Sequence, residues 1–290
     1  MKKIMFVLVA ALACVVTACS EDEAVVNNNE NLITELNLAI EGSDSRLTGE
    51  HVPDVGFKFQ WENNDPVYVY PAEKGNDTFV TFVYDAEDQI FKLETGESGL
   101  VEGKEYYAVC GVTQTSGFNS GEICAKMQLW NSLLANLPMV SDIFTATADE
   151  TFATLHHMAG IVEIPVKGSG NINTIKLSVF YSTTDDKKLC EDFDVKFGDD
   201  GKVETGTITK TGSSCSTIES TTLYKIDNPL ILSETEQSLF FPALPGTYNN
   251  VKVSYNIGNS GGNSIDVSGT LTVQRGKINK KGTAVTINAQ

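Results

Sequence analysis

An alternation of apolar and polar residues in the segment 32–41 constrains the fold of this chain most. The side chains of Leu36, Leu38 and Ile40 fall on one face of that segment, and polar side chains fall mainly on the other. A period of two residues is typical of a half-buried β-strand. Further short apolar runs between turn residues predict strands at 67–70, 78–84, 89–93, 106–112, 159–166, 172–181, 192–197, 205–210, 223–226, 238–241, 251–257, 265–273 and 284–288. Many short strands at close spacing predict packed antiparallel sheets, so we expect an all-β chain.

One segment departs from this period and predicts a single short helix. Trp130, Leu133, Leu134 and Leu137 are spaced i, i+3, i+4 and i+7, and Pro138 ends the run. The Gly-rich stretch 167–171 is the best candidate for a linker. It would separate an N-terminal domain, 47–167, from a C-terminal domain, 168–290, both of ordinary domain size.

The N-terminal residues have the features of an export signal. Lys2 and Lys3 precede an apolar run, 4–18, which is too short to be a comfortable membrane span, and Cys19 follows a small residue. This pattern resembles a bacterial lipobox, which implies that residues 1–18 are removed and that Cys19 carries lipid. The alternative is an ordinary signal peptide that contains a cysteine. Residues 19–31 are polar without periodicity, which predicts a disordered tether. The acidic run directly after Cys19 resembles the surface-export signal of bacterial lipoproteins, which implies a lipoprotein of the outer membrane and cell surface.

The charge balance excludes several classes of function. The chain has 21 basic and 38 acidic residues, a net charge of −17, which disfavours binding to nucleic acid. No nucleotide-binding motif occurs, and His156 and His157, adjacent on a predicted strand, would point to opposite faces. We therefore expect no enzyme, no metal and no cofactor.

Four cysteines remain after the lipobox, namely Cys110, Cys124, Cys190 and Cys215. In an exported protein they could form the local pairs Cys110–Cys124 and Cys190–Cys215, or they could stay buried thiols.

Aromatic side chains cluster in the N-terminal half, namely Trp61, Tyr68, Tyr70, Phe79, Phe82 and Tyr84. At alternating strand positions such residues usually belong to the core. If they were exposed, they could form a platform for sugars. A surface lipoprotein that binds glycan through exposed aromatics, with Trp61 and Trp130 as test positions, is therefore an alternative function.

Arg46 lies in a polar, Gly-containing loop directly after the first predicted strand, and Arg275 is the only other arginine. Loops of this kind are common sites of proteolytic nicking. A solvent-facing arginine without a role is the simpler interpretation of Arg46 when it is considered by itself.

Four segments carry a resemblance to a known family: 59–70, 106–111, 152–162 and 273–279. They are similar, in order, to an aromatic–Trp–Gly–Asp stretch, a Tyr-Tyr-Ala segment, a Phe-x-His-x-x-Ala strand and a closing segment before the last strand. Asn64, Cys110 and Gly111 depart from the family pattern. With the lipobox and the Arg46 loop, the chain resembles a fimbrillin, a subunit of type V pili.

This resemblance implies two transthyretin-like antiparallel β-sandwich domains in tandem. It also implies export as a lipoprotein and cleavage between Arg46 and Leu47 by a trypsin-like protease, so that 32–46 is a cleavable first strand and loop. The partners would be other pilus subunits, and the function that of a shaft, anchor or tip subunit that supports adhesion.

Subunits could assemble by strand exchange if each one were a β-sandwich that lacks one strand. Such a sandwich exposes unpaired edge groups that another strand can fill. Burying Leu36, Leu38 and Ile40 is worth roughly 5–9 kcal/mol as an upper value, so cleavage alone need not release the strand. The candidate donor is the segment 283–290, with Val285, Ile287 and Ala289 on one face. Head-to-tail contacts that do not close form a filament.

Overall fold

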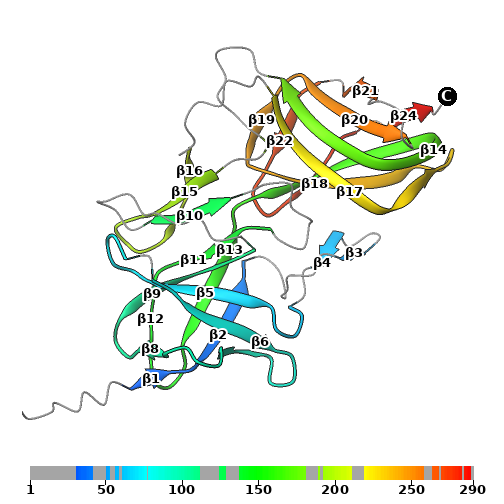
Figure 1. Ribbon diagram of the computed structural model, residues 1–290. Helices are drawn as coiled ribbons and strands as arrows, with labels where there is room; N and C mark the ends of the chain where they lie inside the picture. The colour runs from blue at the N-terminus through cyan, green and yellow to red at the C-terminus, as the bar shows by residue number, and fades with distance from the viewer. Residues whose placement is uncertain are drawn as a thin grey trace, which may run out of the picture. The chain divides into compact units, whose positions relative to one another are not determined.

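The computed structural model describes residues 31–41, 50–52, 56–58, 61–76, 78–111, 124–128, 137–180, 189, 192–210, 219–257, 263–267, 269–282 and 284–288 (Figure 1). All regular secondary structure in these residues is β-strand, so the all-β prediction is confirmed. Within these ranges no helix is long and apolar enough to cross a membrane. Trp130, Leu133 and Leu134 of the predicted helix lie outside the described residues. Leu137, the last residue of its apolar face, is described and is buried.

The N-terminal half contributes thirteen strands. They are β1 (Leu32–Ile33), β2 (Glu35–Ile40), β3 (Glu50–Val52), β4 (Gly56–Lys58), β5 (Pro66–Pro71), β6 (Val80–Asp85), β7 (Ile90–Leu93), β8 (Leu100–Val101), β9 (Glu105–Cys110), β10 (Cys124–Gln128), β11 (Met139–Ser141), β12 (Phe144–Thr145) and β13 (Phe152–His157).

Seven of these strands form a closed sheet. The order β11-β13-β2-β7-β6-β5-β9 is hydrogen-bonded throughout, and β9 also pairs with β11, so the sheet returns to its start. Every pairing in this ring is antiparallel except that of β13 with β2. Apolar side chains of these strands and of Trp61 form one buried cluster, in which Val67, Phe82 and Phe91 are fully buried. The alternation in the sequence thus supplies the core of a barrel-like sheet.

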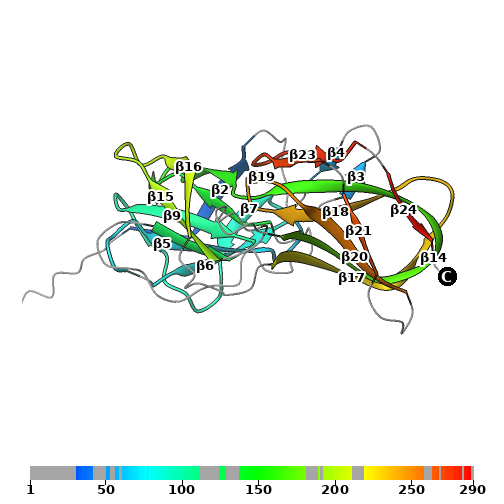
Figure 2. The same ribbon diagram turned by 90° about the horizontal axis from the view of Figure 1, so that it is seen from above.

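The C-terminal half is built around one long strand, β14 (Gly160–Phe180), which Figure 2 shows as a curved green ribbon. The others are β15 (Asp192–Phe197), β16 (Val203–Lys210), β17 (Glu219–Leu232), β18 (Gln237–Ala243), β19 (Gly246–Tyr248), β20 (Val251–Ile257), β21 (Asn263–Asp266), β22 (Leu271–Val273), β23 (Ile278–Lys280) and β24 (Val285–Asn288). β14 pairs with β18 along its first part and with β17 along its second, both antiparallel. It also pairs with β20, and in parallel with β23 and β24.

The predicted linker at 167–171 is wrong, because this stretch lies inside β14. Lys167 and Ser169 pair with β24, and Gly170 and Asn171 pair with β17. Gly168 and Gly170 have φ angles of 135° and 111°, which non-glycine residues rarely adopt, so they allow the strand to bend. The division at 167/168 and the transthyretin-like layout of two sandwiches stay predictions.

A smaller sheet and a third group of buried residues complete the core. β10, β15 and β16 form a three-stranded antiparallel sheet. Its buried Phe193 belongs to a cluster with Tyr107 of β9, Val140 of β11 and Ile161 of β14. Side chains from both halves of the sequence therefore share one apolar cluster.

Candidate strand-exchange site

β2 is an integral member of the closed sheet, between β13 and β7. Leu36 is 0% exposed and Ile40 is 3% exposed, and Leu38 is a partly buried member of the same cluster. Ile33 of β1, 8% exposed, adds a further side chain from the same N-terminal segment. The segment that the sequence predicts as the first strand therefore covers an apolar core.

The two sides of β2 are bonded unequally. β2 runs parallel to β13 along 37–40, but pairs with β7 only at Glu35 and Leu36. At its end, the backbone N–H of Glu41 donates to the carbonyl oxygen of Leu155 in β13, at 2.8 Å. The ladder with β13 is thus the longer of the two.

A polar cluster lies at the C-terminal end of β2, directly before the segment that contains Arg46. We call it the Glu41 cluster; its members are Glu41, Asp142, His156, Lys202 and Arg275. The Nδ1 atom of His156 lies 2.8 Å from Glu41 Oε2, and Nε2 lies 3.1 Å from Asp142 Oδ1. Arg275 Nη2 donates to Glu41 Oε2 at 3.2 Å, and Lys202 Nζ donates to Asp142 Oδ2 at 3.0 Å. Four separate segments of the chain thereby converge on the end of β2.

The electrostatics of the cluster favour its charged carboxylates. Partial burial raises the pKa of Glu41, but the hydrogen bond and charge of His156 and the charge of Arg275 outweigh it, so the net pKa is lowered. Burial likewise raises the pKa of Asp142, and bonds from the Val203 backbone and from Lys202 reverse that effect. The folded state therefore stabilises two carboxylates that hold His156 between them.

His157 has a different environment from its neighbour His156. Its ring is 6% exposed, and burial lowers its pKa from 6.5 to about 4. It packs beside Gly276, where an added Cβ would come within 3.6 Å of the imidazole ring. Adjacent strand residues thus supply one ion-pairing and one core histidine.

The predicted donor segment forms β24, which lies parallel to β14 at 166–169. Val285 is 7% exposed and Ile287 is 0% exposed, so both pack into the C-terminal core. A Cβ on Gly168 would lie only 1.8 Å from the carbonyl oxygen of Ile287, so glycine is required for this close approach. Ala289 and Gln290 lie outside the described residues.

Other predicted site residues fall outside the described part of the chain, namely Cys19, Arg46, Leu47, Cys190 and Cys215. Their roles stay predictions. The alternative pair Cys110–Cys124 is not formed, because Cys110 is a buried free thiol in β9, and burial raises its pKa.

Trp61 does not form an exposed platform, so this part of the glycan-binding alternative is wrong. Its side chain is 8% exposed and meets Phe91 edge-to-face at 4.8 Å and Tyr84 at 6.2 Å. Trp130 lies outside the described residues.

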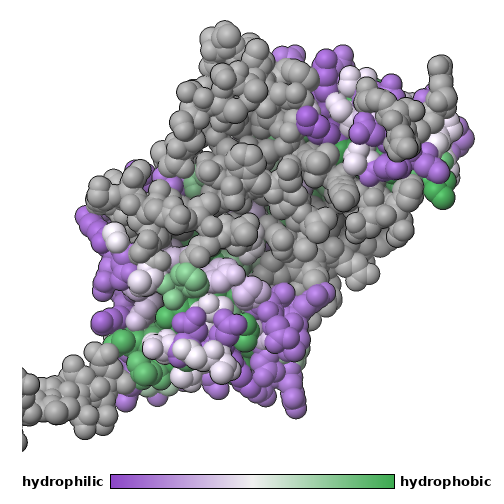
Figure 3. Space-filling model, viewed as in Figure 1, coloured by the Kyte–Doolittle hydropathy of each residue, from purple (hydrophilic) through white to green (hydrophobic). Residues whose placement is uncertain are grey.

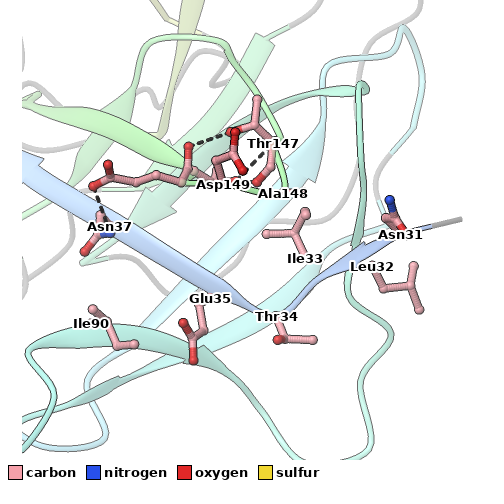
Figure 4. A pocket seen from close by; sticks show the side chains of 12 residues that line it. Asn31, Leu32, Ile33, Thr34, Glu35, Asn37, Ile90, Thr147, Ala148 and Asp149 are labelled. Carbon is pink, nitrogen blue, oxygen red and sulfur yellow. Dashed lines mark hydrogen bonds between the residues drawn. The ribbon is translucent and has the colours of Figure 1, made fainter.

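A pocket of about 460 Å³ lies against the N-terminal end of β2 (Figure 4). One wall is the segment from Asn31 to Asn37, and another is the loop 147–151 that precedes β13. The Asn37 side chain donates to Glu150 Oε1 at 3.4 Å, and the Thr147 N–H donates to Thr151 Oγ1 at 3.0 Å. Because β1 and β2 form a wall of this pocket, it would open further if that segment left the sheet.

Sequence reasoning missed the Glu41 cluster. Glu41 and Arg275 are separated by 234 positions, and no local pattern joins them. The scarcity of arginine was the one available signal, but it identified no partner for Arg275.

Comparison with known proteins supports a fold-level likeness. No family model and no curated protein matches the chain. The structure is similar to that of a candidate cell adhesion protein from Bacteroides ovatus, with a TM-score of 0.51 and 12% identity, covering 88% of this chain and 92% of that chain. The chain shares the fold of that protein.

Two other solved structures are less similar to this chain. A candidate cell adhesion protein from Bacteroides uniformis has a TM-score of 0.48 and 11% identity, covering 88% of this chain and 92% of that chain. A fimbrial protein from Bacteroides ovatus has a TM-score of 0.34 and 11% identity, covering 89% of this chain and 51% of that chain.

Proposed function

We propose that this chain is a structural, non-enzymatic subunit of a cell-surface pilus that assembles by strand exchange. In this proposal Cys19 anchors the precursor to the outer membrane through lipid, a trypsin-like protease cuts after Arg46, and another subunit replaces the released strand. The observation that carries the proposal is the place of β2 in the closed sheet, with Leu36 and Ile40 in the core. The shared fold with a candidate cell adhesion protein supports it.

Removal of β2 would create a vacancy that favours another strand. β13 and β7 would each lose a hydrogen-bonding neighbour, and the core would lose the side chains of Leu36 and Ile40. Unpaired strand edges and an open apolar groove are what β-augmentation requires. A strand with apolar residues at alternating positions would pair with the free edges and fill the apolar groove.

Cleavage by itself would leave β2 in place. Burial of two large side chains contributes roughly 3–6 kcal/mol, and the backbone bonds add to it. A competing strand must therefore be offered at high local concentration, as in a head-to-tail encounter of two subunits.

β24 is the donor in this proposal, and it must first leave its own sheet. Val285 and Ile287 have the two-residue spacing of Leu36 and Leu38. β24 also lies parallel to β14, as β2 lies parallel to β13. Because β24 has only a four-residue ladder with β14, its release costs less than that of a longer strand.

The decisive experiment compares Arg46→Ala with the matched control Ser45→Ala in cells that display the protein. We expect the control to yield a surface form that begins at Leu47 and assembles into ladders on gels. The Arg46→Ala variant should remain a lipid-anchored chain that begins at Cys19 and forms no ladders. Unchanged ladders in Arg46→Ala, or a mature wild-type chain that still begins at Cys19, would overturn the proposal.

A further inference from the structure

A groove lies on the outer face of two neighbouring strands of the closed sheet, β5 and β6, and is bordered by the end of β7 and the turn that follows it. Its volume is about 870 Å³, and its lining includes Tyr68, Phe79, Thr81, Glu94, Thr95 and Glu97. Residues that alternate with these on β5 and β6, such as Val67 and Phe82, point into the core. No residue of β2 lines the groove, although Leu93 at its edge donates its backbone N–H to the carbonyl oxygen of Thr34, directly before β2.

Two aromatic rings give the groove a fixed apolar surface. Tyr68 and Phe79 meet edge-to-face, with ring centroids 5.3 Å apart. Phe79 also contacts Tyr70 at 5.6 Å, and Tyr70 stacks on the buried Tyr107 at 5.4 Å. Because this row of rings is anchored in the core, the two outer rings lose little conformational freedom on binding.

Polar groups surround these rings without partners among the described residues. The hydroxyl groups of Tyr68, Thr81 and Thr95 can donate and accept hydrogen bonds, and the carboxylates of Glu94 and Glu97 can accept them. The backbone N–H of Glu94 donates to the Thr81 carbonyl oxygen at 2.9 Å, which fixes the turn after β7 against β6. The groove thus offers hydrogen-bond acceptors next to an aromatic surface.

The charge of the groove restricts its ligand. Two carboxylates and no Lys, Arg or His side chain line it, and the whole chain has a net charge of −17, so anionic ligands are disfavoured. Apolar sugar faces stack on aromatic rings, and sugar hydroxyls donate to carboxylate and hydroxyl oxygens. In Figure 3, apolar (green) and hydrophilic (purple) side chains lie next to one another over the region where Figure 1 draws β5 and β6.

We propose that this groove binds a neutral oligosaccharide. A basic peptide is the competing occupant, because the groove is acidic. However, β5, β6 and β7 each already have two strand neighbours, so no edge is free for pairing with a peptide backbone. Recognition must therefore use side chains, and those present match sugar hydroxyls and ring faces.

The test is binding of the folded protein to an array of neutral hexasaccharides (cellohexaose, maltohexaose, xylohexaose and laminarihexaose), with sialyllactose and hexalysine as charged probes. We expect millimolar or tighter binding to at least one neutral probe and none to the charged ones. Tyr68→Ala should weaken this binding at least tenfold, and Glu97→Gln severalfold. Ile231→Ser, at an exposed apolar residue outside the groove (69% exposed), is the matched control and should bind as wild type.

Thermal unfolding separates lost binding from lost folding. Tyr68→Phe keeps the ring and removes only the hydroxyl, and Glu97 is exposed, so both of these variants should unfold at the wild-type temperature. No binding to any neutral hexasaccharide would overturn the proposal. Binding that survives both Tyr68→Ala and Glu97→Gln, or binding to hexalysine alone, would overturn it as well.

Discussion

Truncation of Leu36 tests most directly whether β2 is held by the core. Leu36 is fully buried, and Leu32, three residues before β2, is 52% exposed. Removing a buried leucine side chain to alanine costs about 2–5 kcal/mol, because transfer free energy is lost and a cavity remains. We therefore expect Leu36→Ala to lower the free energy of unfolding by about 2–5 kcal/mol, and Leu32→Ala by less than about 0.5 kcal/mol.

Leu36→Ala should also alter the release of β2 after the chain is cut behind Arg46. If the lost energy belongs to the bound state of β2, the equilibrium for release of the cleaved segment rises roughly 30-fold to several thousandfold. Urea unfolding of the uncut chain measures the change in the free energy of unfolding. Mass spectrometry of the cut chain, incubated with a synthetic peptide of residues 283–290, measures the exchanged fraction.

Two results would refute this reasoning. Equal unfolding free energies for Leu36→Ala and Leu32→Ala would mean that the core does not depend on β2. A destabilised Leu36→Ala chain that releases the cut segment no faster than wild type would mean that other contacts hold the strand.

Three other predictions concern Glu41 at the end of β2, His157 in β13 and Gly168, which lies against β24. Glu41→Gln should lower the free energy of unfolding by less than about 1 kcal/mol, because the Glu41 side chain that pairs with Arg275 is 50% exposed. It should nevertheless speed release of the cut strand relative to the control Glu35→Gln, as measured by mass spectrometry. Burial lowers the pKa of His157 to about 4, so between pH 6.5 and pH 4 the unfolded chain binds one proton more than the folded chain. Stability should therefore fall by roughly 3 kcal/mol as the pH falls through this range, and His157→Gln should flatten the urea-midpoint profile. Gly168→Ala should displace β24, because its Cβ would meet the Ile287 carbonyl, and hydrogen exchange of the β24 amides should rise to that of an unpaired segment.

The strand pattern could be predicted where burial on one face follows from local alternation. Leu36 and Ile40 are buried as the two-residue period requires, and so are Val67 and Val69 of β5. These positions are set by the geometry of a single strand, so a local window of sequence contains the information.

Features that depend on contacts between distant segments could not be predicted. The Gly-rich stretch 167–171 has the composition of a linker, and only the approach of Ile287 to Gly168 makes it a bend in a strand. Alternation favours a core position for Trp61, but it does not identify the ring of Phe91 as the edge-to-face partner of Trp61. The Glu41 cluster draws on five separate segments, and none of them carries a local signal of the contact.

The order of strands along the chain explains why one cut could have a large effect. β1 and β2 are the first strands of the described chain, so a cut after Arg46 separates them, and no other described strand, from the rest of the covalent chain. Before such a cut, the tether keeps β2 at an effective concentration that a free competitor does not match. After the cut β2 is a bound peptide with a short ladder on the β7 side, and its departure is opposed only by its own contacts. Proteolysis would thus leave the contacts of β2 unchanged and remove the entropic advantage that protects them.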